Sequence, residues 1–263
     1  MPPAVSLSQL SFSYETKTVL RGIDLEIPRS SYFGVVGSNG SGKTTLAYLI
    51  SGILPPSGGS IDTHGNRVGL VLANPENQVV SLVVEEDIAF GPENLKLSCR
   101  EIKARIDGAL QAVHGEYLRR SLTTELSGGE LAKAVFAGQL ALDADVLVLD
   151  EGTVMLDPNN RKVLLATIRE LNRDLGKTIL HISHRLDDLD GADGIVAIDQ
   201  GEIVARAESV FDLVKGMRAR PIPGIEPGAG ILYQAFLRDA GISAGDPEEA
   251  VCELARRIRC GQG

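Results

Sequence analysis

Long apolar segments are missing from this chain of 263 residues. No apolar run approaches the roughly 20 residues that span a bilayer, so we expect any membrane contact to go through a partner. The start, Met1-Pro2-Pro3-Ala4, lacks a charged region followed by an apolar one, and we expect no signal peptide. Cysteine is scarce as well, because only Cys99, Cys252 and Cys260 occur. Their spacing is not that of a metal site, which suits a reducing cytosol.

Positive charge is in deficit, since 26 lysines and arginines face 35 acidic residues and give a net charge of −9. The nearest approach to a basic block is the Arg-Arg-Ile-Arg run at 256–259, which is more often a solvated helix end than a binding patch. Nucleic acid is therefore not an expected partner. The length suits one large or two small domains, and the apolar content is ample for a core.

The most informative segment is Gly37-Ser38-Asn39-Gly40-Ser41-Gly42-Lys43-Thr44-Thr45, a glycine-rich loop with the spacing G-x-x-x-x-G-K-T. It follows the apolar run 32–36 and precedes the helical pattern 46–50. The glycines let successive N–H groups point at phosphate oxygens, and the positive end of the helix aims at the same anion. We expect Lys43 to reach the β- and γ-phosphates and Thr44 to ligate Mg²⁺. The alternative, a chance glycine-rich turn, does not explain the flanking strand and helix patterns.

The order of strand and helix patterns predicts an α/β fold. Residues 146–149 and 178–183 are continuous apolar runs, typical of parallel strands buried on both faces. Residues 5–12 and 23–27 alternate like half-buried strands, with a turn at 16–18. Further strands are predicted at 32–36, 60–63, 67–72, 194–198 and 202–205, with turns at 64–66 and 199–201. Helices are predicted at 46–52, 84–117 (with 99–113 as a separate lobe), 159–175, 232–240 and 247–259, the last two after a linker at 220–228.

Two carboxylates, Asp150 and Glu151, follow the predicted strand 146–149 directly. In open α/β folds, ligands bind at the carboxyl ends of the strands. We expect Asp150 to orient Mg²⁺ through its water shell, and Glu151 to polarise the water that attacks the γ-phosphate. Acids after a strand are also common N-caps of the next helix. The pair becomes a strong signal only because it occurs together with the glycine-rich loop.

Three further motifs resemble those of ATP-binding cassette (ABC) ATPases. Leu126-Ser127-Gly128-Gly129-Glu130 is similar to their signature motif, Leu156-Asp157 to their D-loop, and His184 to their switch histidine. Tyr14 lies where the family stacks an aromatic ring on adenine. With the loop and the two carboxylates, the resemblance runs from about residue 5 to residue 214 and keeps the motifs in the family's order.

The resemblance implies a P-loop NTPase of the ABC ATPase fold, with a parallel core sheet, an antiparallel β subdomain and a helical subdomain. It implies that the chain binds ATP and Mg²⁺ and acts as a dimer. In the family, Ser127 and the glycines after it close on the γ-phosphate of ATP held by the other subunit. His184 would contact the γ-phosphate of its own site and act there with Glu151 and Lys43.

Two segments, Asn-Pro-Glu-Asn-Gln at 74–78 and the run 84–94, look more narrowly like the ATPases of energy-coupling factor (ECF) transporters. Those transporters power the uptake of vitamins and metal ions. The likeness implies an A-type ATPase on the cytoplasmic face of the membrane, docked on a transmembrane T component that works with a substrate-binding S component. It also implies a cassette over 1–218, with a helical lobe at about 84–142, and a small C-terminal extension over 219–263 as a possible dimerisation region.

The chain departs from the family pattern at several positions. Ala73 stands where the family usually has a glutamine that touches Mg²⁺ and the membrane partner. Gln78 is the nearest candidate to replace it as a metal contact, although the subfamily often carries a glutamine there as well. Lys133 replaces a common arginine and Gly152 a usual proline. Two alternatives stay open: a nucleotide-binding, weakly hydrolysing partner in a heterodimer, and a soluble ABC ATPase outside transport.

The remaining polar and aromatic residues have simpler interpretations. Three histidines lack ligand partners at useful spacing and are expected to be structural: His64, His114 and His181. Three aspartates follow His184 and are expected on a solvated helix face: Asp187, Asp188 and Asp190. The aromatic pair Tyr233 and Phe236 is expected in the core or at a dimer contact.

Overall fold

The computed structural model describes residues 2–152 and 156–239, and its centre is a six-stranded sheet with the order β5-β6-β7-β3-β8-β9. The strands are β3 (Tyr32–Gly37), β5 (Val68–Val71), β6 (Val146–Asp150), β7 (Thr178–Ile182), β8 (Gly194–Asp199) and β9 (Glu202–Ala207). All neighbours run parallel except β8 and β9, which form the hairpin predicted around 199–201. Strands β3, β6 and β7 are buried along their whole length, as their continuous apolar runs predict.

A second sheet is antiparallel and has the order β2-β1-β4, with β1 (Val5–Tyr14), β2 (Lys17–Ile27) and β4 (Gly58–Asp62). Its first turn lies at 15–16 rather than at 16–18. The predicted strands 60–63 and 67–72 fall in different sheets, because β4 pairs with β1 whereas β5 pairs with β6. Both segments are short strands beside a turn, so nothing local distinguishes a hairpin from a crossing between sheets.

The helices fill the connections between the parallel strands. Helix α1 (Lys43–Ile50) follows β3, and α5 (Pro158–Arg173) crosses from β6 to β7. The lobe predicted at 84–142 contains α2 (Val84–Asn94), α3 (Cys99–Ala112) and α4 (Gly128–Ala141). Single 3₁₀ turns connect these elements: η1 (Pro75–Gln78), η2 (Glu116–Leu118), η3 (Thr123–Glu125) and η4 (Leu186–Leu189). The predicted stretch 84–117 is divided because the capping box of Ser98 and Glu101 starts a new helix at α3.

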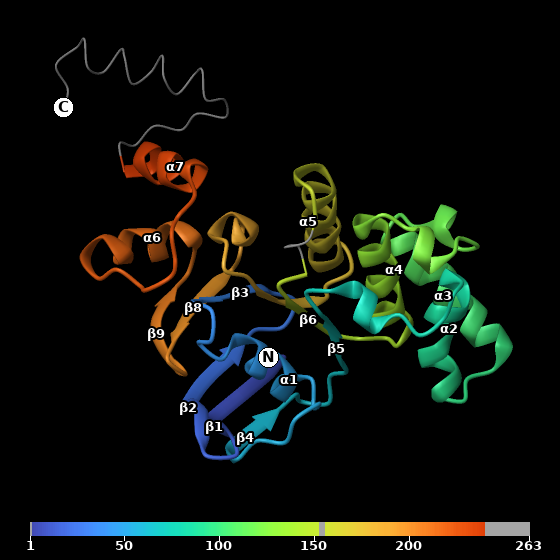
Figure 1. Ribbon diagram of the computed structural model, residues 1–263, viewed down its shortest axis with the longest axis horizontal. Helices are drawn as coiled ribbons and strands as arrows, with labels where there is room; N and C mark the ends of the chain where they lie inside the picture. Colours follow the sequence, from blue (N-terminus) through green and yellow to red (C-terminus); the bar gives the residue numbers. More distant parts are fainter. Residues whose placement is uncertain (1, 153–155, 240–263) are drawn as a thin grey trace, which may run out of the picture.

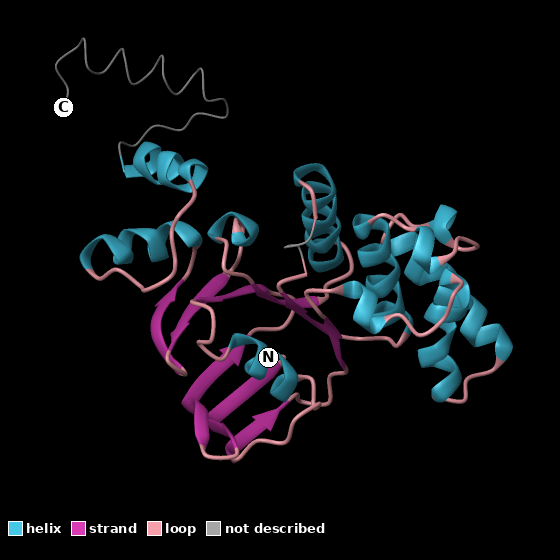
Figure 2. Cartoon of the chain, in the orientation of Figure 1, coloured by secondary structure: helices cyan, strands magenta, loops and turns pink. Residues whose placement is uncertain are grey.

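Figures 1 and 2 show the central sheet running across the middle of the molecule, with the antiparallel sheet on one side of it and α5 on the other. The antiparallel sheet and α1 lie below the central sheet in this view, α5 lies above it, and α2, α3 and α4 stand together to the right. Each face of the central sheet therefore has its own apolar core, and neighbouring residues of β3 divide between them: Val35 belongs to one and Val36 to the other. The predicted α/β P-loop architecture is confirmed.

The chain ends, as far as it is described, in α6 (Val210–Ala219) and α7 (Ala229–Asp239). Helix α7 corresponds to the predicted helix 232–240, whereas the predicted helix 247–259 lies outside the described residues. Between and within these helices, Ile222, Ile225 and Ile231 are buried in the same core as α5. The beginning of the extension thus packs on the cassette. The division of the chain between residues 218 and 219 stays a prediction, as does the role of the C-terminal extension in dimerisation.

Candidate functional site

The glycine-rich loop joins β3 to α1 at the carboxyl edge of the central sheet. Gly42 is the N-cap of α1 with a φ of 106°, and a Cβ there would lie 2.7 Å from a methyl group of Leu20. Only glycine takes this conformation without strain. The start of α1 has no side-chain cap and no acidic residue in its first turn. Its backbone N–H groups are therefore open to an anion, which the helix dipole also favours.

Lys43 lies folded into this loop. Its Nζ donates to the backbone carbonyls of Gly37 and Ser38, each at 2.9 Å, and the residue is only 5% exposed. Burial lowers the pKa of Lys43 below its ordinary value, while the carboxylates of Glu151 and Asp150 act in the opposite direction. The ammonium is thus held at the loop by neutral acceptors that phosphate oxygens can replace.

A cavity of about 380 Å³ opens beside the loop. It is lined from the β1–β2 turn, the loop and the end of β6: Tyr14, Lys17, Val19, Asn39, Gly40, Gly42, Lys43, Thr44, Thr45 and Glu151. Tyr14 is 47% exposed, although its ring meets Phe12 edge-on at a centroid distance of 4.8 Å. An open aromatic ring beside an anion site suits the stacking of a nucleotide base. Sequence reasoning missed Lys17 and Val19, because only the fold brings the β1–β2 turn to the loop.

The two carboxylates at the end of β6 differ in exposure. Asp150 is buried at 4%, and its Oδ1 has no hydrogen-bond partner among the described residues. Burial raises the pKa of Asp150, and a hydrogen bond from the Thr44 side chain opposes this shift. Glu151 reaches the cavity, with a φ of 54° and its N–H donated to the carbonyl of Ile182 at 3.0 Å. A non-glycine residue at positive φ is a strained conformation of the kind that clusters at functional sites.

His184 follows β7, the neighbour of β6, and its imidazole faces Glu151. The distance from His184 Nδ1 to Glu151 Oε1 is 3.5 Å, and Nδ1 has no hydrogen-bond partner among the described residues. The strand end beneath it is fixed, because the N–H of Ser183 donates to the carbonyl of Val35 in β3 at 3.0 Å. Glu151 and His184 follow neighbouring strands, and Glu151 lines the cavity with Lys43, so the three predicted catalytic residues lie together.

The signature motif forms the start of α4. Ser127 is the N-cap, its hydroxyl donates to Glu130 Oε2 at 2.7 Å, and its backbone N–H donates to the same oxygen at 3.0 Å. The Ser127 hydrogen bonds lower the pKa of Glu130, and a hydrogen bond from Tyr117 acts in the same direction. In this structure, the hydroxyl and N–H of Ser127 at the start of the signature motif are thus bonded to a carboxylate of the same chain.

The D-loop lies against the signature motif of the same chain. Asp157 caps α5 by accepting from the N–H groups of Asn159 and Asn160, at 3.0 and 3.2 Å. A Cβ on Gly129 would lie 2.8 Å from the side chain of Asn160, so glycine permits this close approach. The predicted site residues therefore form two groups: the cavity group, and a second group of Ser127, Gly128, Gly129, Glu130 and Asp157.

Gln78 belongs to neither group. Its side-chain Oε1 accepts from the N–H of Leu72 at 2.7 Å, and its Nε2 donates to the carbonyl of Leu70 at 2.8 Å. The amide thus closes η1 back onto the end of β5, and the residue lines a different cavity, beside α2 and α4. We therefore leave Gln78 out of the metal site considered below.

Two expectations about other polar residues have opposite outcomes. Each of the three histidines expected to be structural has a protein partner: His64 contacts Ser6 and Asp62, His114 contacts Glu170, and His181 contacts Tyr32. The expectation of a solvated helix face is wrong for Asp188, which is fully buried and paired with Arg161. The turn η4 is too short to show a helical period, so its burial was hidden from the sequence.

The chain is similar to known proteins of one family. The family model described as "ABC transporter" matches residues 20–154. This chain belongs to the ABC transporter family. A protein from Symbiobacterium thermophilum named energy-coupling factor transporter ATP-binding protein EcfA1 is 37% identical to this ABC ATPase over 92% of this chain and 91% of its own. A protein from Methanosarcina acetivorans named energy-coupling factor transporter ATP-binding protein EcfA is 41% identical, over 76% of this chain and 78% of its own length.

A solved structure leads to the same family. The structure of cbiO1 from Clostridium perfringens, described as part of the ABC transporter complex cbiONQ, has a TM-score of 0.74 and 29% identity. The match covers 84% of this ABC ATPase and 96% of that chain. The predicted resemblance and the predicted ATPase activity are confirmed. Within residues 2–152 and 156–239, no helix combines the length and the apolar character needed to cross a membrane.

Proposed function

We propose that this ABC ATPase is the ATP-hydrolysing A component of an ECF-type importer that takes up a small micronutrient, a vitamin or a metal ion. The observation that carries the proposal is its similarity, over nine tenths of both chains, to a protein named ECF transporter ATP-binding protein. The cavity beside the loop supports it, because an aromatic ring, an anion-binding helix end and a carboxylate line one space.

ATP occupies this cavity in our proposal, with adenine on Tyr14 and the phosphates on the loop of residues 37–45. Lys43 exchanges its two carbonyl acceptors for phosphate oxygens, which accept stronger, charge-assisted hydrogen bonds. The uncapped N-terminus of α1 adds its free N–H groups. The protein thereby holds the triphosphate at the edge of the sheet that carries Asp150, Glu151 and His184.

Thr44 and Asp150 are the residues that would hold Mg²⁺. A hydroxyl and a carboxylate are the oxygen donors that this ion prefers, and the unpartnered buried Oδ1 of Asp150 fits a cation or its bound water. Histidine, cysteine and acidic side chains form no metal-holding group of three in the described part of the chain, so triphosphate oxygens and water would supply the other ligands. When bound, the ion neutralises charge on the β- and γ-phosphates.

Glu151 is the proposed general base. It lies in the cavity, faces His184, and follows the strand that carries the metal-binding Asp150. From there it would take a proton from a water molecule as that water attacks the γ-phosphate in line. Lys43 stabilises the negative charge that develops, and His184 contacts the γ-phosphate and responds to its loss.

A second ABC ATPase subunit, identical or different, is proposed to complete each site. The signature motif of one subunit, with Ser127 and the two glycines after it, would close on the γ-phosphate held by the glycine-rich loop of the other subunit. In the single chain, the Ser127 hydroxyl is already bonded to Glu130, so closure requires this cap to open or to turn. ATP bound between two subunits supplies the anion that makes such a change favourable.

Membrane docking is proposed on the side of the helical lobe. Val80, Leu82 and Phe90 are more than half exposed there. A cavity of about 470 Å³ is lined by Val80 and Leu82 with neighbouring residues from η1 to α4. An apolar surface with an adjoining hollow suits helices of a transmembrane T component, whose S component would bind the micronutrient. The ATPase would then lie peripherally on the cytoplasmic face of the membrane.

The alternative of a weakly hydrolysing partner in a heterodimer rests on Ala73. A methyl group in place of an amide can neither ligate a cation nor orient water, and Gln78 is engaged with β5. ATP turnover of the purified homodimer, compared with that of heterodimers formed with a second cassette subunit, separates the two proposals. Turnover by the homodimer alone would favour the active enzyme.

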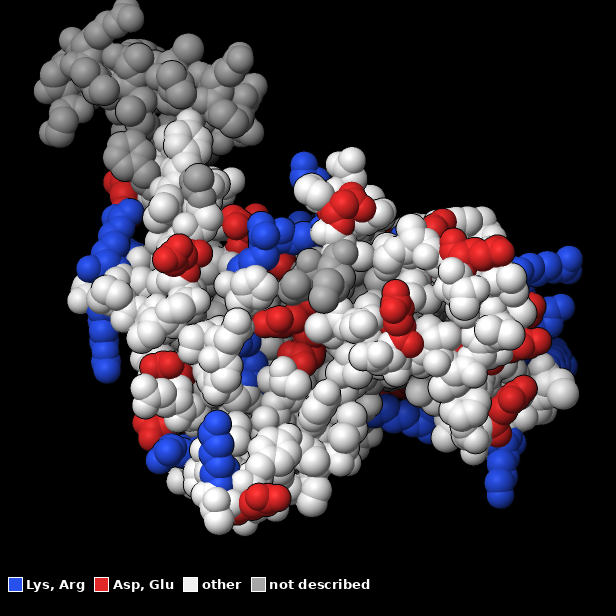
Figure 3. All heavy atoms as spheres, in the orientation of Figure 1, with Lys and Arg blue, Asp and Glu red and all other residues white. Residues whose placement is uncertain are grey.

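The first experiment is an affinity pull-down of tagged Glu151→Gln from solubilised host membranes, with the bound proteins identified by mass spectrometry. Polytopic membrane proteins and a second cassette ATPase support the importer, and the small membrane partner would indicate the micronutrient. Soluble, ribosomal or DNA-bound partners in their place would overturn the transport proposal and leave the ATPase. On the face drawn in Figure 3, acidic and basic side chains of the described residues are interspersed.

The same variant tests the role of Glu151. Because an amide cannot accept the proton, we expect Glu151→Gln to slow ATP turnover roughly 10²–10⁴-fold. Binding of a fluorescent ATP analogue should stay at the wild-type level, since the loop and Tyr14 are intact. Unchanged turnover would show that another group is the base.

A further inference from the structure

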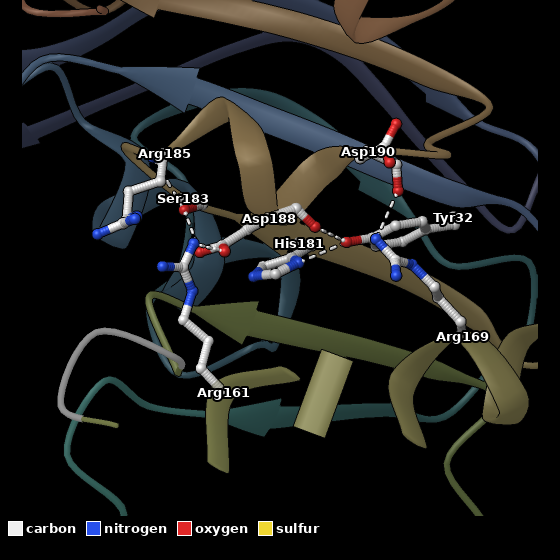
Figure 4. Close-up of polar contacts among 8 residues, drawn as sticks. All are labelled: Tyr32, Arg161, Arg169, His181, Ser183, Arg185, Asp188 and Asp190. Atoms are coloured by element: carbon white, nitrogen blue, oxygen red, sulfur yellow. Dashed lines mark hydrogen bonds and ion pairs between the residues drawn. The ribbon is translucent and has the colours of Figure 1, made fainter. Parts of the chain in front are cut away.

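A buried polar cluster lies directly behind His184, and we refer to it as the Asp188 network: Tyr32, Arg161, His181, Ser183 and Asp188. Figure 4 shows Arg161 pointing from α5 and Ser183 from the end of β7 toward the same carboxylate, with Tyr32 and His181 beside it. Asp188 is fully buried in the turn η4, and the Arg161 side chain is 16% exposed. None of these residues lines the ATP cavity.

Asp188 uses both its side-chain oxygens and its backbone in this cluster. Oδ1 accepts from Arg161 Nη2, and Oδ2 accepts from the Ser183 hydroxyl at 3.1 Å. Its backbone carbonyl accepts from the Tyr32 hydroxyl at 2.6 Å. That hydroxyl also lies 2.8 Å from His181 Nδ1, so the imidazole donates to it from Nδ1. Neutral His181 suits this arrangement, since burial lowers its pKa to about 4.

The partners of Asp188 belong to the two segments that carry the switch histidine and the D-loop. Ser183 is the residue before His184, and its hydroxyl also accepts from the N–H of Arg185, the residue after it, at 3.0 Å. Arg161 lies in the first turn of α5, and its backbone N–H donates to the carbonyl of Asp157 at 2.9 Å. One buried carboxylate thus ties the segment around His184 to the helix that Asp157 caps.

We propose that Asp188 is a positioning residue for ATP hydrolysis, which fixes the switch histidine and the start of α5 as one rigid unit. The proposal rests on the function proposed above, in which His184 acts in its own site and Asp157 lies at the site shared with a second subunit. Loss of the γ-phosphate at His184 then moves Asp157 through Ser183, Asp188 and Arg161. Asp188 itself does not line the ATP cavity.

A purely structural role is the competing explanation, because removing one partner of a buried ion pair is strongly destabilising in itself. The two explanations differ for the variant that lacks both charges. In the double variant Asp188→Asn/Arg161→Gln no unpaired charge remains buried, so the stability lost in Asp188→Asn is largely recovered. A structural role predicts that turnover recovers with it, whereas a positioning role predicts that turnover stays low.

The experiment measures unfolding, ATP binding and ATP turnover for Asp188→Asn, for the double variant and for Ser183→Ala. We expect kcat to fall about 10- to 100-fold in the first two, the order that small misplacements of catalytic groups cause, with KM for ATP near the wild-type value. Ser183→Ala removes one hydroxyl and keeps the ion pair, so it should fold and show a smaller fall in kcat. Should the charge variants fail to fold, Ser183→Ala carries the test.

The matched control is Arg169→Gln, on the same helix. Arg169 Nη2 donates to the carbonyl of Asp190 at 2.9 Å, so it holds the far side of η4 without touching Ser183. We expect this variant to keep its kcat. Wild-type kcat in the double variant, or an equal loss of kcat in Arg169→Gln, would overturn the positioning role.

A spectroscopic measurement separates this proposal from the importer proposal. The chain has four histidines, so the imidazole NMR signals can be assigned with one substitution at a time. We expect Asp188→Asn and Ser183→Ala to shift the signal of His184, and Arg169→Gln to leave it in place. An unmoved His184 signal in Asp188→Asn rejects the positioning role whether or not the protein binds a membrane partner. Failure of the pull-down alone rejects the importer and leaves the role of Asp188 standing.

Discussion

The helices α1 and α4 both begin with a glycine-containing motif that predicts an anion site, yet their N-termini differ. Helix α1 starts at Gly42 without a side-chain cap and without an acid in its first turn. Helix α4 starts at Ser127 with a complete capping box and with Glu130 in its first turn. The first end offers free N–H groups and the second end supplies its own carboxylate. The start of α1 is therefore open to an anion in the single chain, whereas at the start of α4 the hydroxyl and N–H of Ser127 are already bonded to Glu130.

This difference agrees with the division of labour that the proposed function assigns. In that proposal, the loop before α1 binds a phosphate in a single chain, and the Lys43 ammonium already lies against the loop. At the start of α4, the hydrogen bonds with Ser127 lower the pKa of the Glu130 carboxyl group and so favour its charged form. The Glu130 carboxylate therefore repels an approaching phosphate as long as it caps Ser127. In the proposed function, a second subunit brings the anion to the signature end.

Among the variants at the two helix ends, Lys43→Met is expected to have the largest effect on ATP turnover. The variant loses a buried ammonium that stabilises phosphate charge, and ATP turnover should fall about 10²–10³-fold, with ATP binding weakened as well. The comparison is Lys17→Met, which removes an exposed ammonium from the lining of the same cavity and should lower turnover much less than Lys43→Met does. Steady-state turnover and titration with a fluorescent nucleotide measure both. Equal losses would mean that general positive charge, rather than the loop geometry, holds the phosphates.

A smaller effect is expected for Ser127→Ala. Loss of an N-cap lowers the free energy of unfolding by about 0.5–2 kcal/mol, measurable by urea denaturation, while ATP binding by the single chain should not change. Ser98→Ala is the matched control, because Ser98 and Glu101 form the same capping box at the start of α3, away from the ATP cavity. Both variants should lose similar stability, but only Ser127→Ala should slow turnover of the dimer. A turnover loss in both would reduce the role of Ser127 to helix stability.

The smallest effect is the pH dependence of the α4 cap. The pKa of Glu130 is lower in the folded chain than its ordinary value of 4.5, so between these values the unfolded chain binds more protons. The stabilisation by the carboxylate is therefore present above pH 4.5 and is lost as the pH falls through the folded value. Hydrogen exchange of the first α4 amides, corrected for intrinsic rates, should quicken in this range, whereas Glu130→Gln, which can cap without titrating, should lack the change. Identical pH profiles for both proteins would contradict it.

The site residues that the sequence predicted are those in local motifs, because a loop, a strand end or a cap is encoded by consecutive residues. Gly42 and Lys43 are examples, since the spacing of the loop alone predicts a phosphate site there. Lys17 and Asp188 could not be predicted in this way. Lys17 reaches the cavity because a turn folds over the loop, and Asp188 lies in a 3₁₀ turn too short to show which side is buried.

By itself the sequence determined the phosphate loop, the order of strands and helices, and the carboxylates at the end of β6. All of these depend on side-chain period and on spacing within one segment. Only the tertiary structure decided that β4 and β5 join different sheets, that Glu151 and His184 face each other, and that Asp188 pairs with Arg161. Each of these depends on contacts between segments far apart in the chain, which form because the two faces of the central sheet must both be covered by apolar surface.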